Sequence, residues 1–230
     1  MLSVSAGAGQ VRAAHANIRP HMKRLLICCL LAALAVPALA QDPAPKGPAP
    51  AETRPAAWAE PIELEGAPNL HRISPTLYRS EQPTALGMQN LEKLGIRTVI
   101  NLRAFNDDVD EVKGTSLRTE RVKILTWRID DKHVIEVMRM LKKTENAPFL
   151  IHCQHGADRT GLMSAMYRIL EQGWTAEDAL KELVDGGYGY HSMWKNIVRY
   201  VRSVDADKLR AAIESVVPST DSTSTVTDSL

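Results

Sequence analysis

Two short segments that are apolar on both faces constrain the fold of this chain more than any other feature. Arg97–Leu102 and Phe149–His152 are nearly continuous in apolar residues, which is typical of strands that other elements cover on both sides. Each follows a segment with the apolar spacing of a helix, Pro83–Leu94 before the first and Asp131–Lys143 before the second. This alternation predicts an α/β domain with a central, mostly parallel sheet flanked by helices.

The same patterns predict further elements. We expect strands at Thr76–Arg79 and Arg121–Leu125, and helices at Thr160–Gln172, from the capping box Thr175–Asp178 to Val184, and at Ser192–Val204. In folds of this kind, binding sites lie beyond the carboxyl ends of the parallel strands. The strand Phe149–His152 ends at Cys153, and we therefore expect a site there.

The beginning of the chain has the pattern of a secretory signal peptide. A basic pair precedes the twelve apolar residues Leu25–Val36, and small residues follow up to Ala40. Twelve apolar residues are too few for a membrane-spanning helix, which needs about 20. We expect residues 1–40 to be removed after Ala40 and the protein to be exported to the periplasm. The leading segment is unusually long, so both Met1 and Met22 can be the true start.

Removal of this segment changes the charge and the cysteine content. The whole chain has 28 basic and 27 acidic residues, and without residues 1–40 the numbers are 24 and 27, a formal charge of −3. No field of one sign favours nucleic acid or an anionic membrane as the partner. Two of the three cysteines leave with the signal. Cys153 is then a single thiol in an oxidising compartment, exposed to oxidation unless it is buried or used.

The segments on either side of the predicted domain have the composition of unfolded chain. Residues 41–61 are rich in proline and alanine, as in an extended linker. Ser219–Leu230 is almost entirely Ser, Thr and Asp, with too little apolar surface to pack. We therefore expect one folded domain over residues 62–207, with the end of a helix and a disordered tail in residues 208–230.

The loop after the strand Phe149–His152 carries the candidate chemistry. Its sequence is His152-Cys153-Gln154-His155-Gly156-Ala157-Asp158-Arg159-Thr160-Gly161. A short turn from a strand into a helix directs backbone N–H groups inward, and the helix N-terminus adds positive potential, so such a turn binds a phosphate-like dianion. The same field stabilises a thiolate and makes it a nucleophile. We expect the nucleophile to be Cys153 and the phosphate-binding residues to be Gln154, His155, Gly156, Ala157, Asp158 and Arg159.

Several side chains of this loop have expected supporting roles. The planar fork of Arg159 can bind two phosphoryl oxygens. Thr160 can offer its hydroxyl to the sulfur, and His152 can orient the loop through hydrogen bonds. Gly156 permits close backbone approach, and Gly161 lets the helix pack near the sheet.

The order of a strand, His-Cys, five residues, Arg-Thr-Gly and a helix resembles the active-site loop of the cysteine-based protein tyrosine and dual-specificity phosphatases. The resemblance covers about Asn69–Val201 and includes the stretches Asn69–Ser80 and Ala165–Trp174. Within the family, it is similar to the exported bacterial tyrosine phosphatases of the TpbA type. The resemblance implies a dual-specificity-phosphatase-like fold and a two-step reaction through a phosphocysteine at Cys153, with the transition state stabilised by Arg159 and the loop amides. It implies no metal and no organic cofactor.

The family also uses an aspartic acid on an upstream loop to protonate the leaving oxygen. Asp130 and Asp131 lie 23 and 22 residues before Cys153, closer than in the usual arrangement. They begin a predicted helix, so an N-cap role competes with acid catalysis. We prefer Asp130 as the general acid, with Asp131 and Asp158 as rivals. Three weaker candidates are expected to form a solvated acidic loop: Asp107, Asp108 and Asp110.

Three residues near the ends of predicted strands have open assignments. Arg79 is expected to be a surface arginine beside a packed aromatic residue, with the rim of the pocket as the alternative. Arg103 either faces the anion or pairs with the acidic residues that follow it. Trp127 either lines the entrance or fills the core.

Other sites built on the same loop are less consistent with its residues. Zinc would require three or four converging ligands, and His152, Cys153 and His155 have no second cluster at a suitable spacing. A purely structural cysteine leaves the glycines, Arg159 and Thr160 unexplained. A rhodanese-like sulfur transferase fits the Arg-Thr-Gly ending less well.

The expected activity is therefore hydrolysis of phosphotyrosine, and in the dual-specificity case of phosphoserine and phosphothreonine, in an exported or membrane-bound protein substrate. Two alternatives stay open. Asp158 favours a phosphoinositide or inositol phosphate phosphatase, although Gln154, His155 and Ala157 do not supply the basic loop that such a substrate prefers. A non-catalytic phosphate-binding module would keep the loop without a competent acid. The sequence does not determine the oligomeric state.

Overall fold

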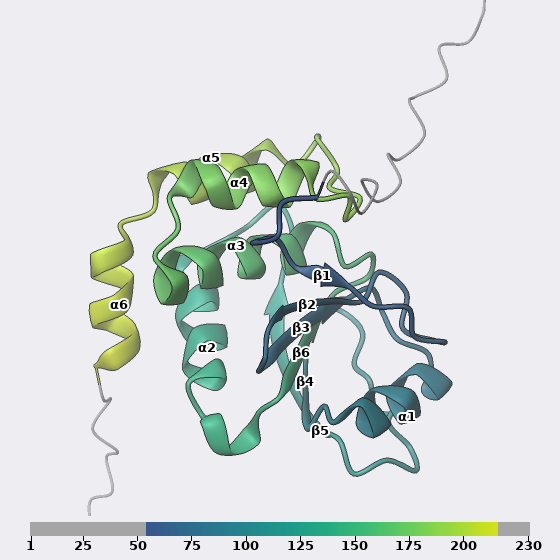
Figure 1. Ribbon diagram of the computed structural model, residues 1–230. Coiled ribbons are helices and arrows are strands. Elements are labelled where there is room, and N and C mark those ends of the chain that lie inside the picture. Colours follow the sequence, from purple (N-terminus) through teal and green to yellow (C-terminus); the bar gives the residue numbers. More distant parts are fainter. Residues whose placement is uncertain (1–53, 216–230) are drawn as a thin grey trace, which may run out of the picture. The chain divides into compact units, whose positions relative to one another are not determined.

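The computed structural model describes residues 54–215, which form one α/β domain (Figure 1). Its sheet has six strands in the order β1-β2-β3-β6-β4-β5. The strands are β1 (Glu60–Pro61), β2 (His71–Ser74), β3 (Leu77–Ser80), β4 (Thr98–Arg103), β5 (Arg118–Ile124) and β6 (Phe149–His152). The helices are α1 (Ala85–Leu94), α2 (Asp131–Leu141), α3 (Asp158–Gln172), α4 (Ala176–Asp185), α5 (Lys195–Ser203) and α6 (Ala206–Glu214), with a 3₁₀ turn at Thr144–Asn146.

Four neighbouring strands, β3, β6, β4 and β5, are parallel, as the sequence predicts. β6 lies between β3 and β4 and pairs in parallel with both, and β4 also pairs in parallel with β5. The two strands that the sequence analysis did not expect, β1 and β2, pair antiparallel at the other edge. Both are short, so they depend on pairing, β1 with β2 and β2 with β3, more than on a strand pattern of their own.

Helices cover both faces of the sheet, and β4 and β6 are therefore buried throughout. Successive side chains of the two strands point to opposite faces of the sheet and belong to two different hydrophobic clusters. Ile100 and Ile151 face the large cluster under α2 to α6, whereas Val99 and Leu150 face the smaller cluster under α1 (Figure 1). This arrangement explains why both strands have almost continuous apolar sequences.

The C-terminal boundary of the domain differs from the expected one. The sequence analysis ends the domain at Asp207 and expects only the end of a helix beyond it, but α6 is a separate helix that packs on the domain. Its Leu209 and Ile213 are buried in the large cluster. Only these two side chains of α6 are buried, so its apolar periodicity is weak. The helix is therefore stabilised by tertiary packing more than by its own sequence pattern.

The N-terminal boundary also differs, because Arg54–Pro61 belongs to the domain and not to a free linker. Ala59 is buried, and its backbone N–H donates a hydrogen bond of 2.7 Å to Glu182 Oε1. The Arg54 guanidinium donates to the carbonyl of Gly186 at 2.6 Å. The alanine- and proline-rich composition of this segment does not indicate these contacts, because they form only with α4 and the loop after it.

The remaining sequence expectations lie outside the described residues. The signal peptide (1–40), most of the linker and most of the Ser/Thr tail fall in residues 1–53 and 216–230. Between residues 54 and 215, every helix is too short or too polar to span a bilayer.

Candidate active site

The candidate nucleophile lies at the centre of the sheet, at the carboxyl end of β6. Cys153 follows this strand directly, and α3 begins at Asp158. The Cys153 side chain is buried. Backbone N–H groups from Gln154 to Asp158 donate no hydrogen bond to any residue within 54–215. The loop therefore presents consecutive free donors at the N-terminus of α3, the arrangement that binds phosphate.

Gly156 is required by the path of this loop. Its φ is +65°, and a Cβ atom would lie 2.5 Å from the backbone nitrogen of Glu81 and 2.6 Å from the carbonyl of Ser80. A side chain at this position would push the loop away from the end of β3. Gly161 is also in a close approach, but a Cβ atom there would meet Leu183 of α4 at 3.3 Å. The helix thus packs closely on α4 at this glycine, and Arg79 Nη2, from β3 of the sheet, lies 3.8 Å from the same Cβ position.

Two polar groups in the first turn of α3 are buried without a partner among the described residues. They are Nε of Arg159 and the hydroxyl oxygen of Thr160. A buried polar group without a partner is costly, so such groups mark places where a ligand or a reacting group completes the hydrogen bonding. Arg159 and Thr160 lie in the first turn of α3, directly after the loop whose N–H groups are free.

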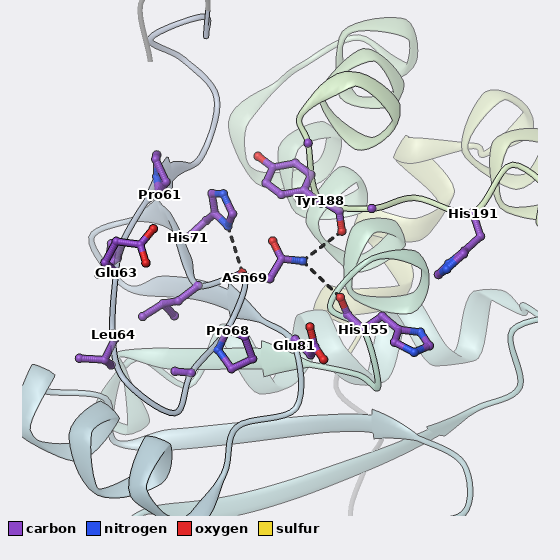
Figure 2. Close-up of a pocket in the computed structure, with 15 residues that line it drawn as sticks. Pro61, Glu63, Leu64, Pro68, Asn69, His71, Glu81, His155, Tyr188 and His191 are labelled. Atoms are coloured by element: carbon purple, nitrogen blue, oxygen red, sulfur yellow. Dashed lines mark hydrogen bonds between the residues drawn. The ribbon is translucent and has the colours of Figure 1, made fainter. Parts of the chain in front are cut away.

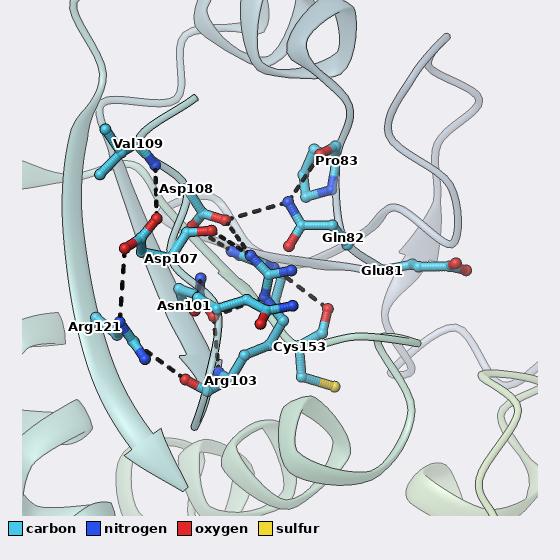
Figure 3. A network of polar contacts seen from close by, with 12 residues as sticks. Glu81, Gln82, Pro83, Asn101, Arg103, Asp107, Asp108, Val109, Arg121 and Cys153 are labelled. Carbon is cyan, nitrogen blue, oxygen red and sulfur yellow. Dashed lines mark hydrogen bonds and ion pairs between the residues drawn. The ribbon is translucent and has the colours of Figure 1, made fainter. Parts of the chain in front are cut away.

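A buried polar network lies behind the loop (Figure 3). His152 Nε2 lies 2.9 Å from Asp108 Oδ2, and its Nδ1 lies 3.4 Å from the carbonyl oxygen of Cys153. Arg103 Nη2 donates to Asp108 Oδ1 at 2.9 Å, and Gln82 Nε2 donates to the same oxygen at 3.2 Å. The network joins the ends of β4 and β6 to the segment after β3.

This network corrects the expectation that Asp108 lies in a solvated loop, since it is only 3% exposed. Burial alone would raise the pKa of Asp108, but its contacts with His152, Gln82 and Arg103 together hold the pKa below its ordinary value. Asp108 is therefore ionised at neutral pH and holds no proton to donate. Of the two roles left open for Arg103, the structure has it paired with the acidic segment. Asp107 and Asp110 are largely exposed, as expected.

Asp130 and Asp131 lie side by side in sequence but have different surroundings. Asp130 is the N-cap of α2, and its half-exposed carboxylate lies 3.7 Å from Lys132 Nζ and 3.9 Å from Arg128 Nε. Asp131 accepts a hydrogen bond of 3.0 Å from the hydroxyl of Tyr200, on α5. Asp130 forms a capping box with His133, so the structure contains the N-cap role that the sequence analysis set against acid catalysis. Asp130 lies at the end of the loop that follows the carboxyl end of β5.

Asp158 is engaged by the loop between α4 and α5. Its Oδ1 accepts from the backbone N–H of His191 at 3.0 Å, and its Oδ2 lies 2.9 Å from His191 Nδ1. The carboxylate is buried. The sequence does not predict this contact, because 33 residues separate the two partners. Trp127, in the turn after β5, is 62% exposed, so it does not fill the core.

A cavity of about 500 Å³ adjoins the loop on the side of His155 (Figure 2). Asn69 closes its floor by donating to the carbonyls of His155, at 3.2 Å, and Tyr188, at 3.0 Å. Burial lowers the pKa of the lining residue His71 to about 4. Charged side chains in the lining are acidic, Glu63 and Glu81, with no Lys or Arg among the lining residues.

The structure also corrects the expectation of a surface position for Arg79. Its side chain is 1% exposed and lies beneath the loop, where Nη2 donates to the carbonyl of Gly156 at 2.7 Å. The guanidinium carbon lies 3.6 Å from the ring centroid of Tyr188. Sequence reasoning missed this residue because an arginine in a short strand resembles an exposed edge position.

Comparisons with known proteins identify the family of the chain. A sequence family described as a DSP-PTPase phosphatase fused to NAD+ kinase matches residues 69–191. The dual specificity protein phosphatase TpbA of Pseudomonas aeruginosa is 40% identical over 164 residues, which are 71% of this chain and 74% of that protein.

Solved structures give the same relation. The crystal structure of TpbA matches with a TM-score of 0.64 and 38% identity, covering 71% of this chain and 100% of that one. A TpbA variant in complex with pTyr matches with a TM-score of 0.63 and 38% identity, covering 70% and 98%. The catalytic core of the PP-IP phosphatase SIW14 from S. cerevisiae shares the fold, with a TM-score of 0.57 and 19% identity over 65% of this chain and 93% of that one.

The family match covers more than half of the chain, and the identity to TpbA extends over most of both proteins. The fold agrees, with a mostly parallel sheet flanked by helices and a cysteine loop at its carboxyl edge. The chain belongs to the DSP-type protein phosphatases, the hydrolase family of the dual-specificity and tyrosine phosphatases.

Proposed function

We propose that this chain is an exported protein phosphatase that hydrolyses phosphotyrosine, and also phosphoserine and phosphothreonine, through a phosphocysteine at Cys153. One observation carries the proposal: a buried free thiol lies at the head of a loop with unpaired backbone N–H groups. This arrangement can bind a phosphoryl group against a nucleophile. The complex of TpbA with pTyr supports phosphotyrosine as the substrate.

The reaction has two steps. The thiolate of Cys153 attacks phosphorus, the bond from phosphorus to the substrate oxygen breaks, and that oxygen takes a proton from Asp130 as it leaves. A water molecule then attacks the phosphocysteine and gives a proton to the Asp130 carboxylate. Inorganic phosphate leaves, and both the thiolate and the protonated acid are restored.

Charge that develops on the phosphoryl oxygens is stabilised by the loop amides and by Arg159. The guanidinium is positioned at the start of α3, and its buried Nε has no partner among the described residues. Donors that are already in place need no reorganisation during the reaction. The buried hydroxyl of Thr160 would donate to the sulfur of Cys153 as that sulfur leaves phosphorus in the second step.

Asp130 is the acid that the surroundings of the aspartates favour. Asp108 is ionised and held by Arg103, Asp131 accepts from Tyr200, and Asp158 is bound through both oxygens to His191. Asp130 and Asp131 are both half-exposed, but Asp131 is engaged by Tyr200, whereas Asp130 lies at the end of the loop that precedes α2, at the carboxyl edge of the sheet. A proton donor needs such access to the leaving oxygen.

The charge around the loop favours a phosphoprotein over an inositol phosphate. Side chains of the adjoining cavity include Glu63 and Glu81 but no Lys or Arg. An inositol phosphate carries several phosphates and needs several cations, and acidic side chains beside the loop would repel it. A phosphopeptide carries one phosphate dianion, and the rest of the peptide can contact the protein through its own neutral or basic groups.

Export is supported by the sequence alone, through the apolar run Leu25–Val36 and the small residues up to Ala40. The test is expression of the full chain in a Gram-negative host, followed by separation of periplasm and cytoplasm. We expect a periplasmic protein whose N-terminal sequence begins at Gln41. A cytoplasmic protein that retains residues 22–40 would contradict export without affecting the phosphatase proposal.

Activity is tested by phosphate release from a phosphotyrosyl peptide by residues 41–230. Wild-type protein is expected to turn over, and Cys153→Ser is expected to lose about 10⁴-fold or more in kcat because the nucleophile is gone. Rapid acid quenching with ³²P-labelled peptide should trap label on the wild-type protein only. Cys153→Ser keeps the loop, so it should still bind the peptide.

Other outcomes point to the alternatives. Peptide binding without turnover in both proteins would indicate a phosphate-binding module. Unchanged turnover in Cys153→Ser would contradict the cysteine mechanism.

A further inference from the structure

We propose that Arg79 is a second cationic group of the phosphate site, a positioning residue that acts on the loop from beneath and favours negative charge at Cys153. The inference rests on the proposed function, because it assumes that the loop holds a thiolate and a phosphoryl group. It assigns a role to a buried arginine that the reaction steps above do not use.

The first argument is the contact of Arg79 with the loop. Its Nη2 donates to the carbonyl oxygen of Gly156 at 2.7 Å. In a trans peptide the carbonyl and the following N–H point in opposite directions across one plane. A carbonyl that points down to Arg79 therefore requires the N–H of Ala157 to point up, away from Arg79 and toward the anion. Arg79 thus fixes the orientation of one of the phosphate donors.

The second argument is the charge of Arg79. The side chain is 1% exposed, its Nε is buried without a partner, and no carboxylate lies within 4.0 Å of it among the described residues. A buried charge without an opposite charge beside it is costly. The anionic loop provides the opposite charge when Cys153 is a thiolate or when a phosphoryl group is bound.

The groups that face Arg79 agree with this reading. Burial lowers the pKa of the Arg79 guanidinium, and Tyr188, Glu182 and Cys153 act against that effect. Arg54 is the one positive neighbour among the charged groups that act on it most strongly. His71 also lies within reach of the Arg79 charge, and its own pKa is lowered to about 4, so it is neutral at pH 7.

Tyr188 holds Arg79 in place. Its ring centroid lies 3.6 Å from the guanidinium carbon, a cation–π contact that requires no negative charge. The tyrosine hydroxyl donates to Glu182 Oε1 at 3.0 Å and accepts from Arg54 Nη2 at 2.5 Å. Glu182 is already paired with Arg168, so its charge does not satisfy Arg79.

Arg168 provides a matched control. It is equally buried, but its Nε and Nη2 donate to the two oxygens of Glu182 at 2.7 and 2.9 Å. Its substitution removes a buried guanidinium of the same size without touching the loop. A merely structural effect would therefore appear in both arginine variants, and an effect on the anion site only at Arg79.

The test measures the pH dependence of Cys153 alkylation by iodoacetamide in residues 41–230, where Cys153 is the single thiol. In Arg79→Gln we expect the pH of half-maximal alkylation to rise by about one unit, the size of effect that one nearby opposite charge has on an ionisable group. Inhibition of turnover by vanadate should weaken by about tenfold, since a fixed donor and a charge are lost. Arg168→Gln should leave both quantities unchanged, and circular dichroism verifies that each variant is folded.

Two results would overturn the proposal: a wild-type alkylation profile in folded Arg79→Gln, or equal shifts in Arg79→Gln and Arg168→Gln. If Arg79→Gln does not fold, Arg79→Lys decides. It keeps the charge and loses the fork, so the alkylation profile should stay as in the wild type while vanadate inhibition weakens; unchanged inhibition would contradict the positioning role. Absence of turnover in the wild type would contradict the proposed function, and the alkylation profiles would still test Arg79.

Discussion

At the residue scale, the aspartates differ more in their surroundings than in their sequence positions. Asp108 and Asp158 are both buried, each with a histidine at 2.9 Å. Asp130 is half-exposed, has ionic contacts of 3.7 and 3.9 Å, and forms a capping box with His133. The contacts of Asp108 with His152, Gln82 and Arg103 hold its pKa below the ordinary value, so Asp108 is poorly suited to release a proton, and Asp158 has both oxygens engaged by His191.

This difference predicts the effect of leaving groups on the acid variants. Asp130→Asn should slow hydrolysis of an alkyl or tyrosyl phosphate by about 10²-fold or more, and p-nitrophenyl phosphate much less, since a good leaving group needs little protonation. Steady-state kcat for the two esters gives the comparison. Asp158→Asn should reduce both rates alike through the loss of its contact with His191. The opposite pattern would make Asp158 the acid.

His71 predicts how stability depends on pH. Burial lowers its pKa to about 4 in the folded protein, whereas an unfolded histidine titrates near 6.5. The unfolded chain therefore binds more protons between these values, and the free energy of unfolding should fall by about 2–3 kcal/mol as pH decreases from about 6.5 to 4. Urea unfolding across this range measures the effect. His71→Asn, which can keep the hydrogen bond to the Asn69 carbonyl, should remove most of it, and an equally steep fall in that variant would assign the effect elsewhere.

At the scale of elements, the segment before the first expected strand behaves as part of the domain. Arg54 donates to Ala59, Gly186 and Tyr188, and Ala59 donates to Glu182. A chain that begins at residue 62 should therefore be less stable than one that begins at residue 54, by about 2–4 kcal/mol at roughly 1 kcal/mol for each hydrogen bond. Urea unfolding of the two chains measures this difference. Equal urea midpoints would show that Arg54–Pro61 does not stabilise the domain and belongs to the linker.

At the scale of the whole molecule, we expect the charge around the loop to discriminate between classes of substrate. The lining of the cavity beside His155 includes two acidic side chains, Glu63 and Glu81, and no Lys or Arg. We expect kcat/KM for a phosphotyrosyl peptide to exceed that for an inositol phosphate by about 10²-fold or more, since several uncompensated phosphates would lie near Glu63 and Glu81. Phosphate release from both substrates at one ionic strength gives the ratio. A ratio below one would favour the inositol phosphate alternative, and Glu63→Gln with Glu81→Gln should then raise that activity further.

The sequence by itself determined the features that depend on neighbouring residues. Apolar periodicity placed β4, β6 and the helices α1 to α5, and the order of strand, Cys153, Gly156, Arg159 and helix placed the candidate active-site loop between β6 and α3. These features need only local geometry, because a turn from a strand into a helix orients its own backbone donors.

The tertiary structure alone decided which distant residues support that loop. Arg79 reaches Gly156 across 77 residues, and Asp108 reaches His152 across 44. Both contacts exist because β6 inserts between β3 and β4, which follow each other in the chain but do not pair. Strand order of this kind leaves no trace in local periodicity. For the same reason, an arginine at the surface and one beneath the phosphate site have the same appearance in the sequence, and only burial distinguishes them.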